Sequence, residues 1–148
     1  VMELISPLGK VYQAGTFSGN PVSVTAGLTT LNILTKQKGR IYGELERAGS
    51  EITRGLADAA EDAGVRAQVN GLASMFQIFF TDRPVIDYET AQSSDKARFM
   101  RYHRELMNGG VFVPPSQFET CFLSSAHTAE DVSKTLEAMG SAIKALKA

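Results

Sequence analysis

The sequence has one cysteine, two histidines, no tryptophan and almost no net charge, and each scarcity excludes a class of protein. Cys121 alone cannot form an intrachain disulfide, and with two histidines it cannot supply a structural zinc site of familiar spacing. Lys and Arg number 15 against 16 Asp and Glu, which gives a formal net charge of -1. Proteins that bind nucleic acid or anionic lipid concentrate basic residues on one face, so neither partner is expected.

Long apolar runs are also missing, because no stretch approaches the roughly 20 residues that span a bilayer. The N-terminus carries no charged region followed by an apolar leader. We therefore expect a cytoplasmic location. Hydrophobic residues make up 43% of the 148 residues and charged residues 21%, which is typical of soluble globular domains with a core of their own. The chain opens on Val1 within an apolar pattern, which favours an interior piece of a longer protein.

The first 40 residues are divided by glycine, proline and one polar stretch. Residues 1–19 contain enough glycine and proline to predict a loop with brief extended pieces. A helix is predicted over 21–35, because Asn20 is a favoured N-cap and Pro21 suits the first helical position. Few charges interrupt this helix, so we expect it to be largely buried. The polar stretch 36–40 is the best candidate for a domain boundary.

The remainder alternates helical and extended patterns, which predicts an α+β fold: a small antiparallel or mixed sheet with helices packed on one face. A long helix should end at Gly64, and Asn70 and Gly71 should lie in a hairpin connection longer than two residues. Thr128 and Asp131 resemble a capping box at the start of the last helix. The expected elements are helix 41–63, strands 65–69 and 75–81, loop 82–93, a helix from Ser94 or Asp95 to Gly109, strands 111–113 and 120–125, and a helix from 128.

Ordinary catalytic constellations are missing. His103 lies on an amphipathic helix and His127 next to a helix start, so structural roles are favoured for both. Cys121 lies between aromatic residues and is expected to be a core residue. No Gly-x-Ser-x-Gly motif supports nucleophilic hydrolysis. The residues themselves therefore predict neither a catalytic side chain nor a metal site.

The most informative stretch is residues 11–21, Val-Tyr-Gln-Ala-Gly-Thr-Phe-Ser-Gly-Asn-Pro. Gly15, Ser18 and Gly19 let the backbone approach a ligand closely, Thr16 supplies a hydroxyl, and a helix begins directly afterwards. These features suit a phosphate, although a glycine-rich loop before a helix is often only a turn. The stretch is neither a Walker loop nor a Gly-x-Gly-x-x-Gly fingerprint.

This segment resembles the Gly-Thr-x-x-Gly-Asn-Pro segment of class III, fold type I pyridoxal-phosphate (PLP) aminotransferases. The resemblance covers essentially the whole chain, and its later motifs are similar to the aminomutase members of the class. The motifs are residues 1–3, 7–9, 12–16, 18–21, 75–76, 79–81, 115–119, 125–128 and 130–131.

The resemblance implies a cofactor, pyridoxal 5'-phosphate or pyridoxamine 5'-phosphate, whose phosphate contacts Gly15 and Thr16 across a homodimer interface. It implies that Glu119 lies near the substrate pocket, where a carboxylate would repel the second carboxylate of ordinary dicarboxylic amino acids. Taken without the resemblance, a lone glutamate between two strands is more often a solvated loop residue.

The resemblance also implies that the Schiff-base lysine and the substrate-carboxylate arginine precede Val1, so this chain contains no catalytic residue and should be inactive alone. Residues 1–35 would end the large PLP-binding domain and 36–148 would form the small C-terminal domain. The implied activity of the whole protein is conversion of the small-molecule substrate (S)-4-amino-5-oxopentanoate to 5-aminolevulinate. The alternatives are a class III ω-aminotransferase and a free-standing, non-catalytic binding domain.

Overall fold

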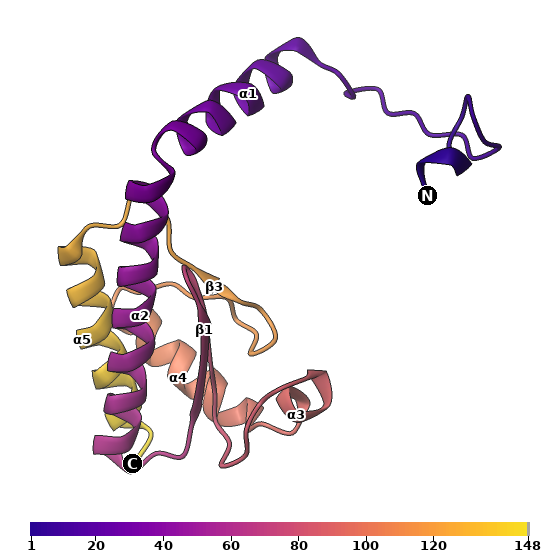
Figure 1. Cartoon of the computed structure of the whole chain (residues 1–148). Helices are drawn as coiled ribbons and strands as arrows, with labels where there is room; N and C mark the ends of the chain where they lie inside the picture. Colours follow the sequence, from indigo (N-terminus) through magenta and orange to yellow (C-terminus); the bar gives the residue numbers. More distant parts are fainter. Residues whose placement is uncertain (148) are drawn as a thin grey trace. The chain divides into compact units, whose positions relative to one another are not determined.

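The computed structural model describes residues 1–147, and the chain divides into two compact units. The N-terminal unit is Val1–Lys38, and the C-terminal unit begins at Gly39. Most of the secondary structure belongs to the C-terminal unit, and Figure 1 shows the elements in chain order.

The N-terminal unit contains a short 3-10 helix, η1 (Met2–Leu4), and one long helix, α1 (Pro21–Lys36). The side chain of Asn20 caps α1 by accepting hydrogen bonds from the Val22 and Ser23 amides, at 3.0 and 3.2 Å. The predicted start of the helix is thus confirmed. Its predicted burial is wrong within this chain, because α1 has no buried residue and Val22 is 78% exposed. The apolar side chains of α1 have no core to enter in the described residues.

The C-terminal unit is built from four further helices and a three-stranded antiparallel sheet of order β1-β2-β3. The long helix ends where predicted, since Gly64 takes a left-handed conformation with φ of +62°. Its elements are α2 (Lys38–Ala63), β1 (Gln68–Leu72), β2 (Met75–Phe79), α3 (Tyr88–Gln92), α4 (Lys96–Asn108), β3 (Cys121–Phe122) and α5 (Ala129–Ala145).

One hydrophobic cluster joins the sheet to the three long helices of this unit. Phe76 and Ile78 of β2 enter it, together with residues such as Leu56 of α2, Leu106 of α4 and Ile143 of α5. Because side chains alternate along a strand, Phe79 faces the other way and packs instead with Val85 and Ala91. The predicted α+β fold, with an antiparallel sheet packed on helices, is confirmed.

The β1–β2 hairpin differs from the prediction. Leu72 pairs with Met75, so the turn consists of Ala73 and Ser74 alone and is a two-residue connection. Gly71 lies within β1, where a Cβ would overlap Thr53 of α2. The glycine is therefore used for close packing of the strand on the helix, and Ala73 takes the left-handed turn conformation with φ of +52°.

Three other expectations are corrected. The predicted loop 82–93 contains α3, started by a reciprocal capping box between Asp87 and Thr90. Residues 111–113 form no strand, because the Val111 amide bonds to Leu106 O at the end of α4 and the following prolines have no amide donor. The predicted strand 120–125 is reduced to the two residues of β3. Thr128 and Asp131 form the predicted capping box of α5.

Candidate functional site

The glycine-rich stretch forms a tight turn just before α1. The Ser18 amide donates to Gly15 O at 3.0 Å, and the Asn20 amide donates to Phe17 O at 3.1 Å. Gly19 has φ of +73°, a conformation that favours glycine, and a Cβ at Gly15 would come within 2.8 Å of Ser18 Oγ. The backbone of the turn thus favours glycine at position 19, and a side chain at position 15 would require Ser18 Oγ to move.

The donors available to an anion lie on this turn and not on the helix end. Asn20 Oδ1 already accepts from the two amides that begin α1. In residues 1–147, the Thr16 hydroxyl and amide and the Phe17 amide make no hydrogen bond, and both residues are exposed. A phosphate prefers charge-assisted hydrogen bonds from this kind of donor set, so Gly15 and Thr16 fit the phosphate contact that the resemblance implies.

Glu119 lies on the loop 114–120 that leads into β3, and its side chain is exposed. The loop contains a local turn, because the Glu119 amide donates to Ser116 O at 3.1 Å and the Phe118 amide donates to Ser116 Oγ at 3.2 Å. The ring of Phe118 lies 5.6 Å from that of Tyr88, measured between centroids. The Glu119 carboxylate is therefore presented to solvent on an organised loop.

Two buried glutamines hold this loop, and the sequence reading missed both. Gln77 of β2 is 7% exposed, and its Nε2 donates to Ser116 O at 3.4 Å and to Glu119 O. Gln117 is 3% exposed and donates to Ala91 O at 3.3 Å and to Ser94 O at 3.5 Å. A polar residue within the apolar run 75–80 was the available signal for Gln77.

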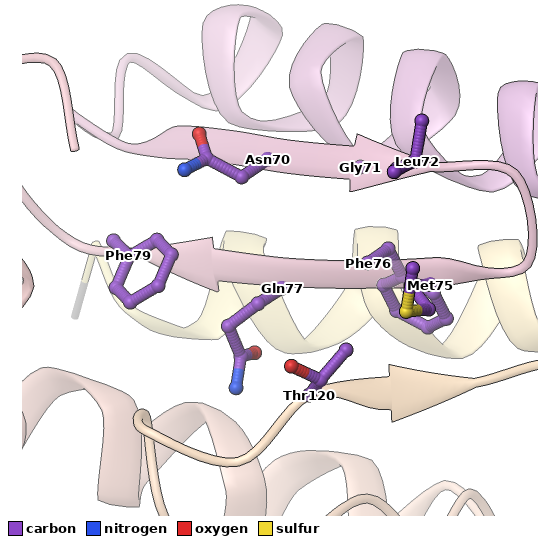
Figure 2. Close-up of a pocket in the computed structure, with 8 residues that line it drawn as sticks. All are labelled: Asn70, Gly71, Leu72, Met75, Phe76, Gln77, Phe79 and Thr120. Carbon is purple, nitrogen blue, oxygen red and sulfur yellow. The ribbon is translucent and has the colours of Figure 1, made fainter. Parts of the chain in front are cut away.

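A shallow hollow of about 340 Å³ lies on the sheet beside this loop, and Figure 2 shows its lining. Apolar side chains and two amides, Asn70 and Gln77, make up most of its wall, and Thr120 contributes a hydroxyl. No lining residue is titratable near neutral pH, so the hollow supplies no general acid or base. Its lining is Asn70, Gly71, Leu72, Met75, Phe76, Gln77, Phe79 and Thr120.

The remaining candidate residues have structural surroundings. His103 Nε2 lies 3.1 Å from Val113 O, and His127 Nδ1 accepts from the Ser124 amide at 3.0 Å just before the cap of α5. Cys121 belongs to the hydrophobic core, and its burial raises the pKa of the thiol to about 11. Their predicted structural roles are confirmed.

Residues 1–147 contain neither a metal-binding cluster nor a membrane-spanning helix. No group of three His, Cys, Asp or Glu side chains there could hold a metal ion. No helix in that part of the chain is both long and apolar enough to cross a bilayer.

The fold matches solved PLP transaminases. An ω-transaminase from Sphaerobacter thermophilus superposes with a TM-score of 0.80 at 27% identity, over 99% of this chain and 34% of that one. A β-phenylalanine aminotransferase from Variovorax paradoxus gives 0.79 at 25% identity, over 95% and 32% of the two chains. A transaminase with PLP bound gives 0.78 at 22% identity, which shows the fold alone. No family model matches the chain.

Sequence similarity to curated proteins narrows the class of enzyme further than the fold does. The chain is 52% identical over 147 residues to glutamate-1-semialdehyde 2,1-aminomutase of Methanothermobacter thermautotrophicus, and 47% identical over 147 residues to that of Nitrosopumilus maritimus. Each alignment covers 99% of this chain and about a third of the relative, 34% and 35%. The resemblance to class III aminotransferases and their aminomutase members is thus confirmed over the matched segment. The roles of Gly15, Thr16 and Glu119 stay predictions.

Proposed function

We propose that this chain is the C-terminal part of a PLP-dependent aminomutase, an isomerase that converts glutamate-1-semialdehyde, (S)-4-amino-5-oxopentanoate, to 5-aminolevulinate for tetrapyrrole synthesis. The observation that carries the proposal is the 46–52% identity to eight proteins of that name over at least 93% of the chain. We place the whole protein in the cytoplasm.

The first role of this segment is to bind the cofactor phosphate. The Thr16 hydroxyl and the amides of Thr16 and Phe17 are exposed donors, and glycine at position 15 leaves room beside them. When bound, PLP or its amine form supplies an electron sink for charge on the substrate carbon. The turn contributes position: it fixes the phosphate end through hydrogen bonds that need no basic side chain.

The second role is selection of the substrate by Glu119. An exposed carboxylate repels the second carboxylate of a dicarboxylic amino acid but not a neutral aldehyde, so it disfavours the competitor and spares the semialdehyde. Specificity by a repulsive element lowers binding of the wrong substrate without requiring a new attractive contact. No atom of this chain is required to form a covalent bond.

The organisation of the chain supports a division between a large domain and a small one. We assign residues 1–35 to the end of the large domain and 36–148 to the small domain. Apolar side chains of α1 and the preceding loop, such as Tyr12, Phe17 and Val22, are exposed here. In the whole protein we expect the rest of the large domain and the second subunit of a homodimer to cover them.

The test uses the full-length protein that contains this segment. Purified enzyme with glutamate-1-semialdehyde should form 5-aminolevulinate without an amino acceptor. Thr16→Val should weaken PLP retention, measured by absorbance after dialysis. Thr30→Val, which removes a hydroxyl that donates to Ala26 O within α1, serves as the matched control. Transfer of an amino group to 2-oxoglutarate, with no 5-aminolevulinate formed, would overturn the proposal in favour of an ω-aminotransferase.

A free-standing binding domain is the second candidate, and the self-contained core of the C-terminal unit favours it. It requires the 148-residue chain to be a monomer despite the exposed apolar side chains of the N-terminal unit. We expect the isolated chain to self-associate in light scattering, and removal of residues 1–38 to give a monomer. A monomeric 148-residue chain would support the binding domain.

A further inference from the structure

We propose that Gln77, together with Gln117, is a positioning residue that sets the location of the Glu119 carboxylate. The inference rests on the proposed function, because the readout is the substrate selection assigned to Glu119. Neither glutamine forms a hydrogen bond with that carboxylate in residues 1–147, so both act through the backbone of the loop 114–120.

Gln77 joins the loop to the central strand of the sheet. Its Nε2 donates to the carbonyl oxygens of Ser116 and Glu119, the two residues that close the local turn. Its Oε1 accepts from the Ile78 amide at 3.0 Å, so both the nitrogen and the oxygen of the side-chain amide have partners. Because Gln77 is buried on a strand paired on both sides, the amide is held by a rigid support.

Gln117 joins the same loop to the region of α3 and the start of α4. Its side chain leaves the loop and donates to Ala91 O in α3 and to Ser94 O just before α4. The loop is therefore tied to the sheet through residues 116 and 119 and to the helical region through residue 117. Glu119 lies two residues beyond Gln117, so its backbone cannot shift without stretching one of the two attachments.

The composition of these attachments explains why an amide is used. Two carbonyl oxygens require donors, and a glutamine side chain supplies two N–H groups without introducing a charge. Methionine has similar length and volume but donates no hydrogen bond. Gln77→Met would leave the Glu119 carbonyl without its donor and Ser116 O with the Glu119 amide alone, so the loop would lose its attachment to the sheet and could shift. A shift of about 1 Å is enough to change a reaction rate substantially.

The experiment compares Gln77→Met with Asn70→Leu in the full-length enzyme. Asn70 is the cross-strand partner of Gln77, and its Nδ2 likewise donates from a strand to a loop carbonyl, Val85 O at 2.8 Å, so this control has the same surroundings but supports a different loop. We expect Gln77→Met to lower kcat/KM for the semialdehyde relative to glutamate by about tenfold, and Asn70→Leu to leave that ratio unchanged. Equal loss in both variants would overturn the proposal.

A double-variant cycle separates positioning from general damage. In a Glu119→Gln background there is no carboxylate left to misplace, so Gln77→Met should cause no further change in the substrate ratio. Additive losses in the two variants would mean that Gln77 acts independently of Glu119. If Gln77→Met does not fold, Gln117→Met takes its place with the same expected ratio, and an unchanged ratio there counts against the proposal.

Hydrogen exchange tests the attachment without any activity. The Glu119 amide is protected by Ser116 O, so Gln77→Met should speed its exchange by about tenfold relative to Asn70→Leu. If Gln77→Met speeds the exchange but the enzyme does not act on the semialdehyde, the role of Gln77 in holding the loop is supported and the proposed function is rejected. Unchanged exchange would reject the attachment whatever the activity.

Discussion

The N-terminal and C-terminal units both contain long helices, but these helices are stabilised differently. In the C-terminal unit, Leu56, Leu106 and Ile143 are fully buried in one cluster. In the N-terminal unit, α1 contains a comparable share of apolar residues and buries none of them. The order of α1 comes from its cap and backbone hydrogen bonds, whereas the order of the other unit comes from packing.

This difference teaches that an apolar sequence predicts a need for burial and does not identify what provides it. Isolated helices gain little from propensity alone, and most helical stability in proteins comes from packing of one face. The apolar side chains of α1 therefore need a covering surface that the N-terminal unit does not supply. The C-terminal unit buries a core of its own, and substitutions should separate the two.

The largest effect is expected from shortening leucine in each unit. Leu106→Ala should lower the free energy of unfolding by about 2–5 kcal/mol, because it opens a cavity in the core. Leu28→Ala on α1, where the side chain is 59% exposed, should change it by less than about 0.5 kcal/mol. Urea denaturation of the 148-residue chain, at a concentration where light scattering shows no association, measures both, and similar losses would contradict the division.

Replacing a glycine by alanine should give a smaller difference in stability between the two units. Gly49 of α2 faces the hairpin turn, where a Cβ would overlap Ala73 O, so Gly49→Ala should destabilise the chain by about 1–3 kcal/mol. Gly27 of α1 has no atom near its Cβ position, and Gly27→Ala should increase helicity by circular dichroism without loss of stability. A stable Gly49→Ala protein would show that the hairpin moves away easily.

Tyr102 tests whether every polar group in the core is needed. The side chain is 2% exposed, its hydroxyl has no hydrogen-bond partner in the described residues, and burial raises its pKa far above the usual value. Tyr102→Phe should therefore raise the free energy of unfolding by about 1 kcal/mol in thermal or urea denaturation. A loss of stability would indicate a partner such as a buried water.

The smallest effect is expected on the stability of the protein at acidic pH. Hydrogen bonds from Thr128 lower the pKa of Asp131, and those from Thr90 lower the pKa of Asp87. A lowered folded-state pKa adds stability above the unfolded value of roughly 3.9, and this stability is lost as pH falls through the folded value. The midpoint temperature of thermal unfolding should decrease as the pH is lowered below about 4, and this decrease should be smaller in Asp131→Asn.

The acid response should be confined to the C-terminal unit. Asn20, the cap of α1, is neutral and keeps its acceptor at every pH. Circular dichroism from α1, isolated by subtracting the spectrum of the chain without residues 1–38, should stay constant over the same range. A parallel loss of α1 would show that the two units unfold together.

Local features of the fold could be predicted, and features set by packing could not. Asn20, Asp95 and Thr128 were identified as helix starts because a cap bonds within three residues of itself. Asn-Gly is the strongest local turn signal, yet Gly71 lies within β1 against Thr53 of α2, and the chain reverses at Ala73 and Ser74. Such a contact cannot be seen in a short stretch of sequence around the turn.

The candidate site followed the same rule. Gly15 was identified from a local pattern whose backbone needs are visible in the sequence, and Glu119 entered only through resemblance to a family. Gln77 escaped notice because its partners are 39 and 42 residues away. A single polar residue within a buried strand is the most that a sequence shows of such a long-range contact.

The attachments of the Glu119 loop also determine how the site should respond to ionic strength. Gln77 and Gln117 hold the loop with uncharged groups, and hydrogen bonds between uncharged groups are not screened by dissolved ions. The field of the exposed Glu119 carboxylate is screened over a Debye length of about 10 Å at 0.1 M salt. The rejection of dicarboxylic substrates that we propose for Glu119 should therefore weaken with added salt while the loop stays in place.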